Sequence, residues 1–595
     1  MKNICAHSLL MAILLLYAGS STAGESSYYT DRPAWSGMWT DAGPDRDITP
    51  YLSYIAGTAG RIRWMNVEKS EGVYDWSEIL QSLTKARENN YYYYFIFWTG
   101  PVAPEWIYTT GGVPKVIFAD KSRRDAPYYL NDNYRKYVKR FISNLAEFLA
   151  NLDPSLLERL AFVQPGFGAT GDRQLYKAPP LDPQYAINSD QYVAFMKEMT
   201  LHLVSEFKKY PQTAKIKFLF NLDDFDDDSG ATTADKTDRK RGEMLYAQWM
   251  RQNFDCQLRK QQFTDATGYM AVNEKDDDDA QRPSFFGYSR PPKWGGNPEY
   301  VRGEQNDPKF AETPMAIVSQ QWHYYWTAIS TVDRGLDFWE TNWKYLFTGK
   351  FAEAYKFASR YSGYKKAETS PYAFVALRDV LDYSDGERFP AREYGEVSRD
   401  NTQRINKILE KYRQYGARND DNDAVKKLGG YVYLEKSKGL NDCVWNVIAR
   451  NYSRFMTQYD PNGTSVGLWR VGSVEEPYGR FARSFEGATG RNAMYFSVES
   501  AFFGGEALNG RYPVEVRVIY FDKGVGSWEL RYDAVDNRNK TAYRVTKTDT
   551  GRWVEKRVTL TDARFGKRCP NQTDLYLYNT DTEDDIFHLV ELKKI

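Results

Sequence analysis

Cysteine and histidine are scarce in this chain, and neither sign of charge is in excess. Its 595 residues include 4 cysteines and 4 histidines, and 79 basic residues balance 79 acidic ones. A net charge of zero provides no global field toward nucleic acid or an anionic membrane, so we expect neither partner. Cys256, Cys443 and Cys569 are too scattered for a metal-ligand set or a disulfide framework. At most one bridge, such as Cys443 to Cys569, fits this spacing.

Long apolar runs are also missing after the first few residues. The stretch 9–17 follows Lys2 and precedes Ser21-Thr22-Ala23, which is the layout of a secretory signal cleaved after Ala23. It is too short to span a membrane. We therefore expect residues 1–23 to be a signal peptide and the mature protein to be periplasmic or secreted, without a membrane span.

Short apolar runs, in contrast, recur along the first 400 residues, and most of them end on an acidic or aromatic residue. Helical or irregular stretches separate them, including amphipathic segments at 134–152 and 192–210. Strand and helix in alternation predict an α/β fold, a (β/α)8 TIM barrel with parallel strands. The eight runs are 38–41, 61–68, 91–98, 160–168, 216–223, 268–274, 300–304 and 335–340.

The pattern changes after a polar, charged stretch at 389–427. From residue 514 onward, alternating apolar and polar residues are separated by short turns, which is typical of an antiparallel β-sandwich. We therefore predict a barrel domain at 24–427 and a C-terminal sandwich domain at 428–595. No exposed aromatic platform is visible in the sandwich sequence, so support of the barrel is its expected role.

Two carboxylates lie where a TIM barrel carries its chemistry, at the carboxyl ends of strands. Asp172 follows the glycine-rich turn after the fourth run, and Glu304 ends the seventh run with Arg302 nearby to keep it ionised. Glycoside hydrolysis needs a carboxylic acid for the leaving oxygen and a carboxylate that attacks or activates water. This pair predicts Asp172 as the acid and Glu304 as the nucleophile or base.

Three further motifs resemble the opening of clan A glycoside hydrolases, in particular family 42 β-galactosidases. They are Arg63-Trp64, EGVYDW at 71–76 and Pro104-Glu105-Trp106. The resemblance implies an acid/base Glu after strand four and a nucleophilic Glu after strand seven, and Glu304 matches the second. The clan's Asn-Glu pair is absent before Asp172, whose turn GFGATGD is more similar to the turn before the acid of family 14 β-amylases. The general character of the chain, with YFDKG at 520–524, resembles carrageenan-degrading relatives of family 42.

Other residues near the strand ends are expected to shape the sugar subsite: Glu68, Trp98, Asp223, Asp224, Glu274, Trp339 and Glu340. Cations also crowd the loops on this face, among them Arg124, Arg173 and Lys240. Arginine forks and lysine charges bind sulfate esters well, whereas the alternative is ordinary solvated loop charge.

Together these features predict a secreted enzyme that cleaves β-galactosidic bonds of an algal, sulfated, carrageenan-like galactan. Three alternatives stay open: a β-galactosidase for neutral oligosaccharides, a β-amylase-like inverting hydrolase, and a non-catalytic sugar-binding barrel. No cofactor or metal is expected, because no second His or Cys lies near His323 and the acidic clusters at 223–228 and 276–279 lack EF-hand spacing.

Overall fold

The computed structural model describes an α/β region followed by a β-rich region. It covers residues 32–221, 241–260, 301–305, 319–411 and 440–595, with gaps at 122, 170–173, 244, 247–248, 251–252, 254–256, 334–336, 365, 379–385, 387–388, 398–401, 443–444, 448–450, 460–465, 470, 474, 480 and 505–510. The expected signal peptide therefore lies outside the described residues.

Eight parallel strands form a closed barrel in the order β1-β10-β9-β8-β7-β6-β3-β2. They occupy most of the expected positions, which confirms the α/β barrel prediction. The strands are β1 (Gly37–Thr40), β2 (Ile55–Arg63), β3 (Tyr92–Trp98), β6 (Leu160–Gly166), β7 (Lys217–Asn221), β8 (Gln257–Lys260), β9 (Val301–Gln305) and β10 (Phe338–Thr341).

Two strands differ from their predicted positions. The sixth place in the barrel belongs to β8, whereas the expected run 268–274 lies outside the described residues. β2 begins six residues early and ends at Arg63, because small residues in it escape an apolar pattern. A Cβ on Gly57 would lie 2.7 Å from the Trp39 ring, and one on Gly60 would lie 1.8 Å from the Tyr93 hydroxyl. Small residues are therefore required where this strand meets aromatic neighbours.

Helices surround the barrel, and two of them confirm the amphipathic segments. α5 (Asp132–Ala150) begins where the Asn131 side chain accepts a hydrogen bond from the Tyr134 N–H, and α7 (Ser189–Lys208) begins with a capping box of Asn188 and Gln191. The other helices are α2 (Trp64–Val67), α3 (Ser77–Glu88), α4 (Trp106–Thr109), α6 (Pro154–Leu157), α11 (Gln320–Asp333), α12 (Trp343–Leu346), α13 (Ala352–Tyr361), α14 (Ala391–Tyr394) and α15 (Thr402–Lys411).

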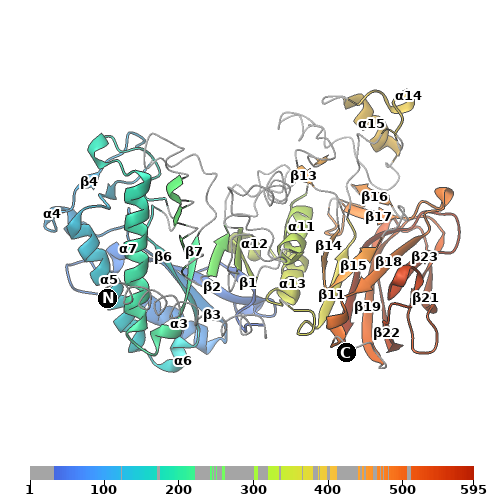
Figure 1. Cartoon of the computed structure of the whole chain (residues 1–595), viewed down its shortest axis with the longest axis horizontal. Coiled ribbons are helices and arrows are strands. Elements are labelled where there is room, and N and C mark those ends of the chain that lie inside the picture. The colour runs from blue at the N-terminus through green and yellow to red at the C-terminus, as the bar shows by residue number, and fades with distance from the viewer. Residues whose placement is uncertain are drawn as a thin grey trace, which may run out of the picture.

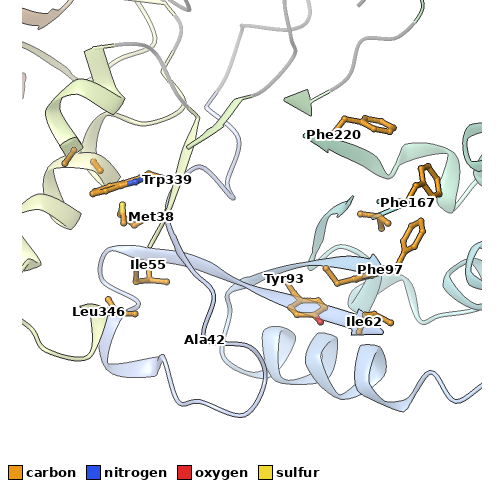
Figure 2. Close-up of a cluster of buried hydrophobic side chains, with 14 of the residues drawn as sticks. Met38, Ala42, Ile55, Ile62, Tyr93, Phe97, Phe167, Phe220, Trp339 and Leu346 are labelled. Carbon is orange, nitrogen blue, oxygen red and sulfur yellow. The ribbon is translucent and has the colours of Figure 1, made fainter. Parts of the chain in front are cut away.

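Alternate residues of the barrel strands face the helices and the barrel interior. Outward side chains such as Met38, Ile62 and Phe97 join the large core between strands and helices (Figure 2). A separate cluster of Trp39, Tyr94, Phe162, Phe338 and their neighbours fills the interior. The barrel is therefore packed from both sides.

The C-terminal part contains two antiparallel sheets, which supports the sandwich prediction (Figure 1). A seven-stranded sheet holds β11 (Tyr372–Ala376), β14 (Tyr452–Arg454), β16 (Val466–Trp469), β17 (Phe481–Ser484), β19 (Tyr512–Asp522), β22 (Arg552–Ala563) and β24 (Ile586–Lys594). A five-stranded sheet holds β15 (Met456–Tyr459), β18 (Ala493–Val498), β20 (Ser527–Tyr532), β21 (Lys540–Thr546) and β23 (Leu575–Asn579). Two-stranded pairs are β4 (Lys115–Val116) with β5 (Ala126–Pro127) and β12 (Leu440–Asp442) with β13 (Trp445–Val447).

The two large sheets enclose one core, to which Val516 of β19 and Leu577 of β23 both belong. The chain changes sheets at Phe455, between β14 and β15, where a φ of 59° turns the backbone sharply. β11 pairs with β24, so strands of the sandwich sheet begin at Tyr372, well before the expected boundary at residue 428. The short apolar sequence of β11 resembles that of a barrel strand. Only its pairing with β24 shows that it belongs to the seven-stranded sheet.

The barrel packs against the seven-stranded sheet through α11. The indole N–H groups of Trp322 and Trp326 donate to the carbonyls of Glu476 and Gly479, at 2.9 and 2.8 Å. The buried His588 ring on β24 lies 3.0 Å from the Tyr325 hydroxyl of α11. Apolar packing and polar contacts together thus join the barrel to the sandwich.

The Cys569 thiol is free and buried, and it donates to the Arg538 carbonyl at 3.1 Å. The Cys443–Cys569 bridge that the sequence allowed is therefore not formed. Among the described residues, no helix is long and apolar enough to cross a membrane.

Candidate active site

Aromatic rings fill the lower interior of the barrel and form the floor of the candidate site. The Trp39 ring lies 5.4 Å from Tyr94 and 5.5 Å from Phe338, and Phe162 stacks on Phe338 at 5.1 Å. These residues come from β1, β3, β6 and β10, on different sides of the barrel. The rings close the interior, so a ligand enters only above them, at the carboxyl ends of the strands.

A buried carboxylate lies directly above this floor. Glu340 on β10 is 1% exposed, and the Tyr94 hydroxyl on β3 donates to its Oε2. Because Tyr94 and Glu340 are on strands separated by β2 and β1, the hydrogen bond crosses the interior. The sequence marked Glu340 but gave no signal for Tyr94, since its partner is 246 residues away.

The backbone register places Glu304 beside Glu340. In the parallel pairing of β9 with β10, Arg302 is opposite Phe338 and Glu304 is opposite Glu340. Phe338 belongs to the interior floor. Two of the predicted site residues thus occupy matching positions on adjacent strands, at the end of the barrel where the chemistry is expected.

Asp172 and Arg173 lie outside the described residues, as do Asp223, Asp224 and Glu274. The structure does describe what flanks Asp172. The Ala169 N–H donates to the Gln174 carbonyl at 2.8 Å, which closes the loop between them. A Cβ on Gly100 would lie 2.7 Å from the Gly168 carbonyl oxygen, so the loop after β3 packs tightly against the start of this turn. The assignment of Asp172 as the acid stays a prediction.

Glu68 has a different environment from the one expected of a sugar ligand. Its side chain is fully buried beyond the short helix α2, and its oxygens accept hydrogen bonds from Trp64 Nε1 at 2.7 Å and Gly72 N at 2.7 Å. Arg140 of α5 donates to Oε1 at 2.6 Å. With both oxygens occupied inside the protein, Glu68 joins the loop after β2 to α5, and these contacts argue against sugar binding.

The EGVYDW segment also packs against α5. Arg140 bonds to Glu71 at 2.9 Å and to the Tyr74 hydroxyl at 3.2 Å. Tyr74 stacks on Trp76 at 5.6 Å, and burial raises the pKa of Tyr74 to about 12. In this protein the motif residues build the wall of the barrel and position the loop after β2.

The two predicted tryptophans face opposite sides of the barrel wall. Trp98, half-buried at the end of β3, packs against the interior cluster. Trp339 is fully buried on the outward face of β10, 6.0 Å from Tyr324 of α11 and 6.1 Å from Tyr355 of α13 (Figure 2). This position argues against the expected sugar contact of Trp339, because strand alternation turns it away from its neighbour Glu340.

Acidic partners neutralise some cations of the loops on this face, and Lys240, like Arg173, lies outside the described residues. Arg123 pairs with Asp120 and Arg241 with Asp190, each at 3.3 Å. Arg124 is exposed and forms no ion pair within the described part of the chain. Arg124 thus stays a candidate for anion binding on this face, whereas Arg123 and Arg241 already have acidic partners.

Sequence reasoning missed a polar cluster at the ends of β1, β2 and β10. The Asp41 carboxylate accepts from Trp343 N at 2.7 Å and pairs with Arg61 at 3.3 Å. Arg61 is 47% exposed on an interior register position of β2, opposite Ile96. The Arg46 guanidinium covers the Trp343 ring at 3.8 Å. Asp41 was visible as a strand end, but only pairing shows its partners.

No group of three or more His, Cys, Asp or Glu suited to a metal ion occurs among the residues that the structure describes. Carboxylates, an aromatic floor and a half-buried indole are the chemistry of the described site. This set suits a ligand with hydroxyl groups and flat apolar faces.

Comparisons with known proteins give distant structural likenesses alone. No family model matches the sequence, and no curated protein matches it. A cold-adapted β-galactosidase from Rahnella sp. R3 has 13% identity and a TM-score of 0.29, with 53% of this chain and 52% of that chain covered. A β-galactosidase from the psychrophilic Marinomonas ef1 has 13% identity, a TM-score of 0.30 and coverages of 52% and 54%.

A GH5_18 protein from Streptomyces cattleya, in complex with GlcNAc, has 10% identity and a TM-score of 0.32, with 53% of this chain and 70% of that chain covered. This chain thus spans about half the length of the Rahnella enzyme that it matches. At this level the likenesses assign no activity to the chain, whose closed eight-stranded barrel carries the candidate site.

Proposed function

We propose that this protein is a glycoside hydrolase that cleaves β-galactosidic bonds of an algal galactan. The observation that carries the proposal is the register of Glu304 and Glu340 on adjacent strands, above an aromatic floor in a closed barrel. Carboxylates at the carboxyl ends of barrel strands are the groups that glycoside hydrolysis requires. The motif resemblance to family 42 supports the galactosidic linkage.

In the proposed mechanism Glu304 is the nucleophile or base and Asp172 is the acid. The acid protonates the leaving oxygen while the carboxylate stabilises or attacks the oxocarbenium-like centre. Glu340, fixed by the Tyr94 hydroxyl, supplies a second negative charge beside Glu304. Trp98 offers the half-buried ring on which a sugar face stacks.

The decisive experiment incubates the protein with a panel of algal galactan oligosaccharides and follows the products. Glu304→Gln keeps the shape of the side chain but removes its charge, so we expect hydrolysis to be lost while the fold is retained. Glu158→Gln is a matched control, because Glu158 is exposed before β6, at the opposite end of the barrel. Near wild-type turnover by Glu304→Gln would contradict the assignment.

The acid is tested by leaving-group dependence. We expect Asp172→Asn to slow poor leaving groups far more than activated aryl galactosides, which need little protonation. Equal slowing of both would assign the acid to another carboxylate. NMR detection of the first-formed anomer separates a retaining enzyme from a β-amylase-like inverting one.

We further propose that the galactan is sulfated. Arg61 and Arg124 support this, since both are exposed cations on strands or loops of this face. Loss of one charge-assisted bond to sulfate should lower kcat/KM about tenfold or more. The test compares a sulfated oligosaccharide with its desulfated counterpart for Arg124→Ala, Arg173→Ala and Lys240→Ala, with Arg87→Ala on the opposite side as control. Equal use of the desulfated sugar would favour a neutral β-galactosidase.

A further inference from the structure

The outward face of the five-stranded sheet carries a row of tyrosines that the sequence pattern does not reveal. Tyr459 of β15 is in register with Tyr495 of β18, and Tyr495 is in register with Tyr576 of β23. The same row continues to Arg531 of β20. Three aromatic residues on neighbouring strands therefore line up across the sheet, perpendicular to the strands.

These tyrosines lie on the side of the sheet away from the sandwich core. Their strand neighbours Met494, Phe496, Leu575 and Leu577 belong to that core, so alternation turns the tyrosines outward. Tyr459 is 51% exposed and Tyr495 is half-buried, whereas Tyr576 is buried at 4% exposure. The row thus presents ring surface to solvent, most of all at Tyr459.

Side-chain contacts hold Tyr495, Tyr576 and Tyr578 in place. The Tyr495 and Tyr576 rings lie 5.6 Å apart, and Tyr578 meets Tyr576 edge-on at 6.4 Å. The Arg531 guanidinium covers the Tyr578 ring at 4.3 Å, and its Nε donates to Glu529 at 2.7 Å. With strands about 4.8 Å apart, three rings extend over about 10 Å. Tyr576 is buried within the row, so the exposed ring surface belongs to Tyr459, Tyr495 and Tyr578.

The remaining outward residues are small or hydrophilic. They are Thr457, Ala493, Ser497, Glu529, Thr541, Arg544 and Thr546, and Leu, Ile, Val, Met and Phe are absent from these outward positions of the described strands. The core of a protein–protein interface is apolar and depleted in charge. Flat rings flanked by hydroxyl and guanidinium groups instead match a sugar chain, which has apolar ring faces and hydroxyl edges.

We propose that this tyrosine face, formed by Tyr459, Tyr495 and Tyr578 around the buried Tyr576, binds a polysaccharide chain, namely the polymer that the barrel cleaves. The proposal rests on the proposed function for the identity of the polymer. The chain runs across the strands along the row, with sugar rings stacked on Tyr459 and Tyr495. The sandwich then holds polymer near the enzyme in addition to supporting the barrel.

The test measures retardation of the full-length protein in native gels that contain κ-carrageenan or agarose, with gels lacking polymer as reference. We expect Tyr459→Ala and Tyr495→Ala each to weaken retardation about five- to tenfold, because a stacking ring is lost. Tyr459→Phe, which keeps the ring, should retain most binding. Tyr210→Ala removes a half-buried tyrosine at the end of α7 and is the matched control. Thermal unfolding checks that each variant is folded.

A second measurement separates this proposal from the proposed function. Hydrolysis of a short aryl β-galactoside should be the same in Tyr459→Ala, Tyr495→Ala and wild type, whereas polymer degradation at low concentration should slow. The proposal that the tyrosine face binds polymer fails if the alanine variants are retarded as strongly as wild type. It also fails if neither polymer retards wild type. If wild type binds polymer through these residues but cleaves no substrate, the face stands and the hydrolase assignment fails.

Discussion

The Tyr94 hydroxyl on β3 donates a hydrogen bond to the Glu340 carboxylate on β10, across the interior of the barrel. This contact connects the aromatic floor to the acidic residues above it. It also fixes Glu340 on the strand that neighbours Glu304. The hydrogen bond therefore links barrel packing to the proposed chemistry.

Removal of this donor should cost stability. Tyr94→Phe leaves the ring in place but takes a hydrogen bond from a buried carboxylate, and we expect a loss of about 1–3 kcal/mol in the free energy of unfolding. Urea denaturation measures it. Tyr543→Phe is the control, because the buried Tyr543 hydroxyl has no hydrogen-bond partner among the described residues. Equal costs for the two variants would show that the Tyr94 contact contributes nothing.

The two tryptophans should separate binding from stability. Trp98→Tyr shortens a half-buried ring at the end of β3 but keeps an aromatic side chain against the interior cluster, so we expect a higher KM for the oligosaccharide with a smaller loss of stability than truncation to Ala would cause. Trp339→Phe leaves a cavity where the buried indole contacts Tyr324 and Tyr355. We expect it to lower the free energy of unfolding by roughly 1–2 kcal/mol and to leave KM unchanged. Kinetics and thermal unfolding check both. A KM effect of Trp339→Phe in folded protein would restore the subsite that the structure argues against.

The Glu68–Arg140 contact should be structural. Arg140→Met leaves the Glu68 carboxylate buried without its cation, which we expect to destabilise the protein by about 3 kcal/mol. The matched control is Arg135→Met on the same helix, whose partners Asp132 and Glu198 are 91% and 31% exposed, and at most about 1 kcal/mol is expected there. Chemical denaturation compares them. A destabilisation of Arg140→Met no larger than that of Arg135→Met would contradict the structural role.

The barrel–sandwich contact should weaken in acid through His588. Burial between α11 and the seven-stranded sheet lowers the pKa of His588 to about 3, below the value of about 6.5 for an exposed imidazole. The unfolded chain thus binds an extra proton between these values. Stability is full above pH 6.5 and falls as the pH drops, by about 2 kcal/mol between pH 7 and pH 5. Denaturation of wild type and His588→Gln at both pH values measures this, and equal losses would contradict it.

Apolar runs were sufficient to find much of the barrel because β1, β3, β6 and β10 are buried on both faces. β3, β6 and β10 lie close to the predicted runs. β8, with the sequence QLRK, and the glycine-rich start of β2 escaped, because polar and small residues give no apolar signal. Pairing with neighbouring strands, not local composition, makes these segments into strands.

For the site, the sequence by itself determined which carboxylates lie at the ends of barrel strands, because the apolar runs and the residues that end them can be read along the chain. It placed Glu304 and Glu340 on the seventh and eighth strands, and their register agrees. Tertiary structure decided which side each residue faces and what it contacts. Trp339 turns to the helices, Glu68 is enclosed by Arg140, and Tyr495 lies in register between Tyr459 and Tyr576 of the neighbouring strands. Such contacts join residues far apart in the chain, so no local pattern contains them.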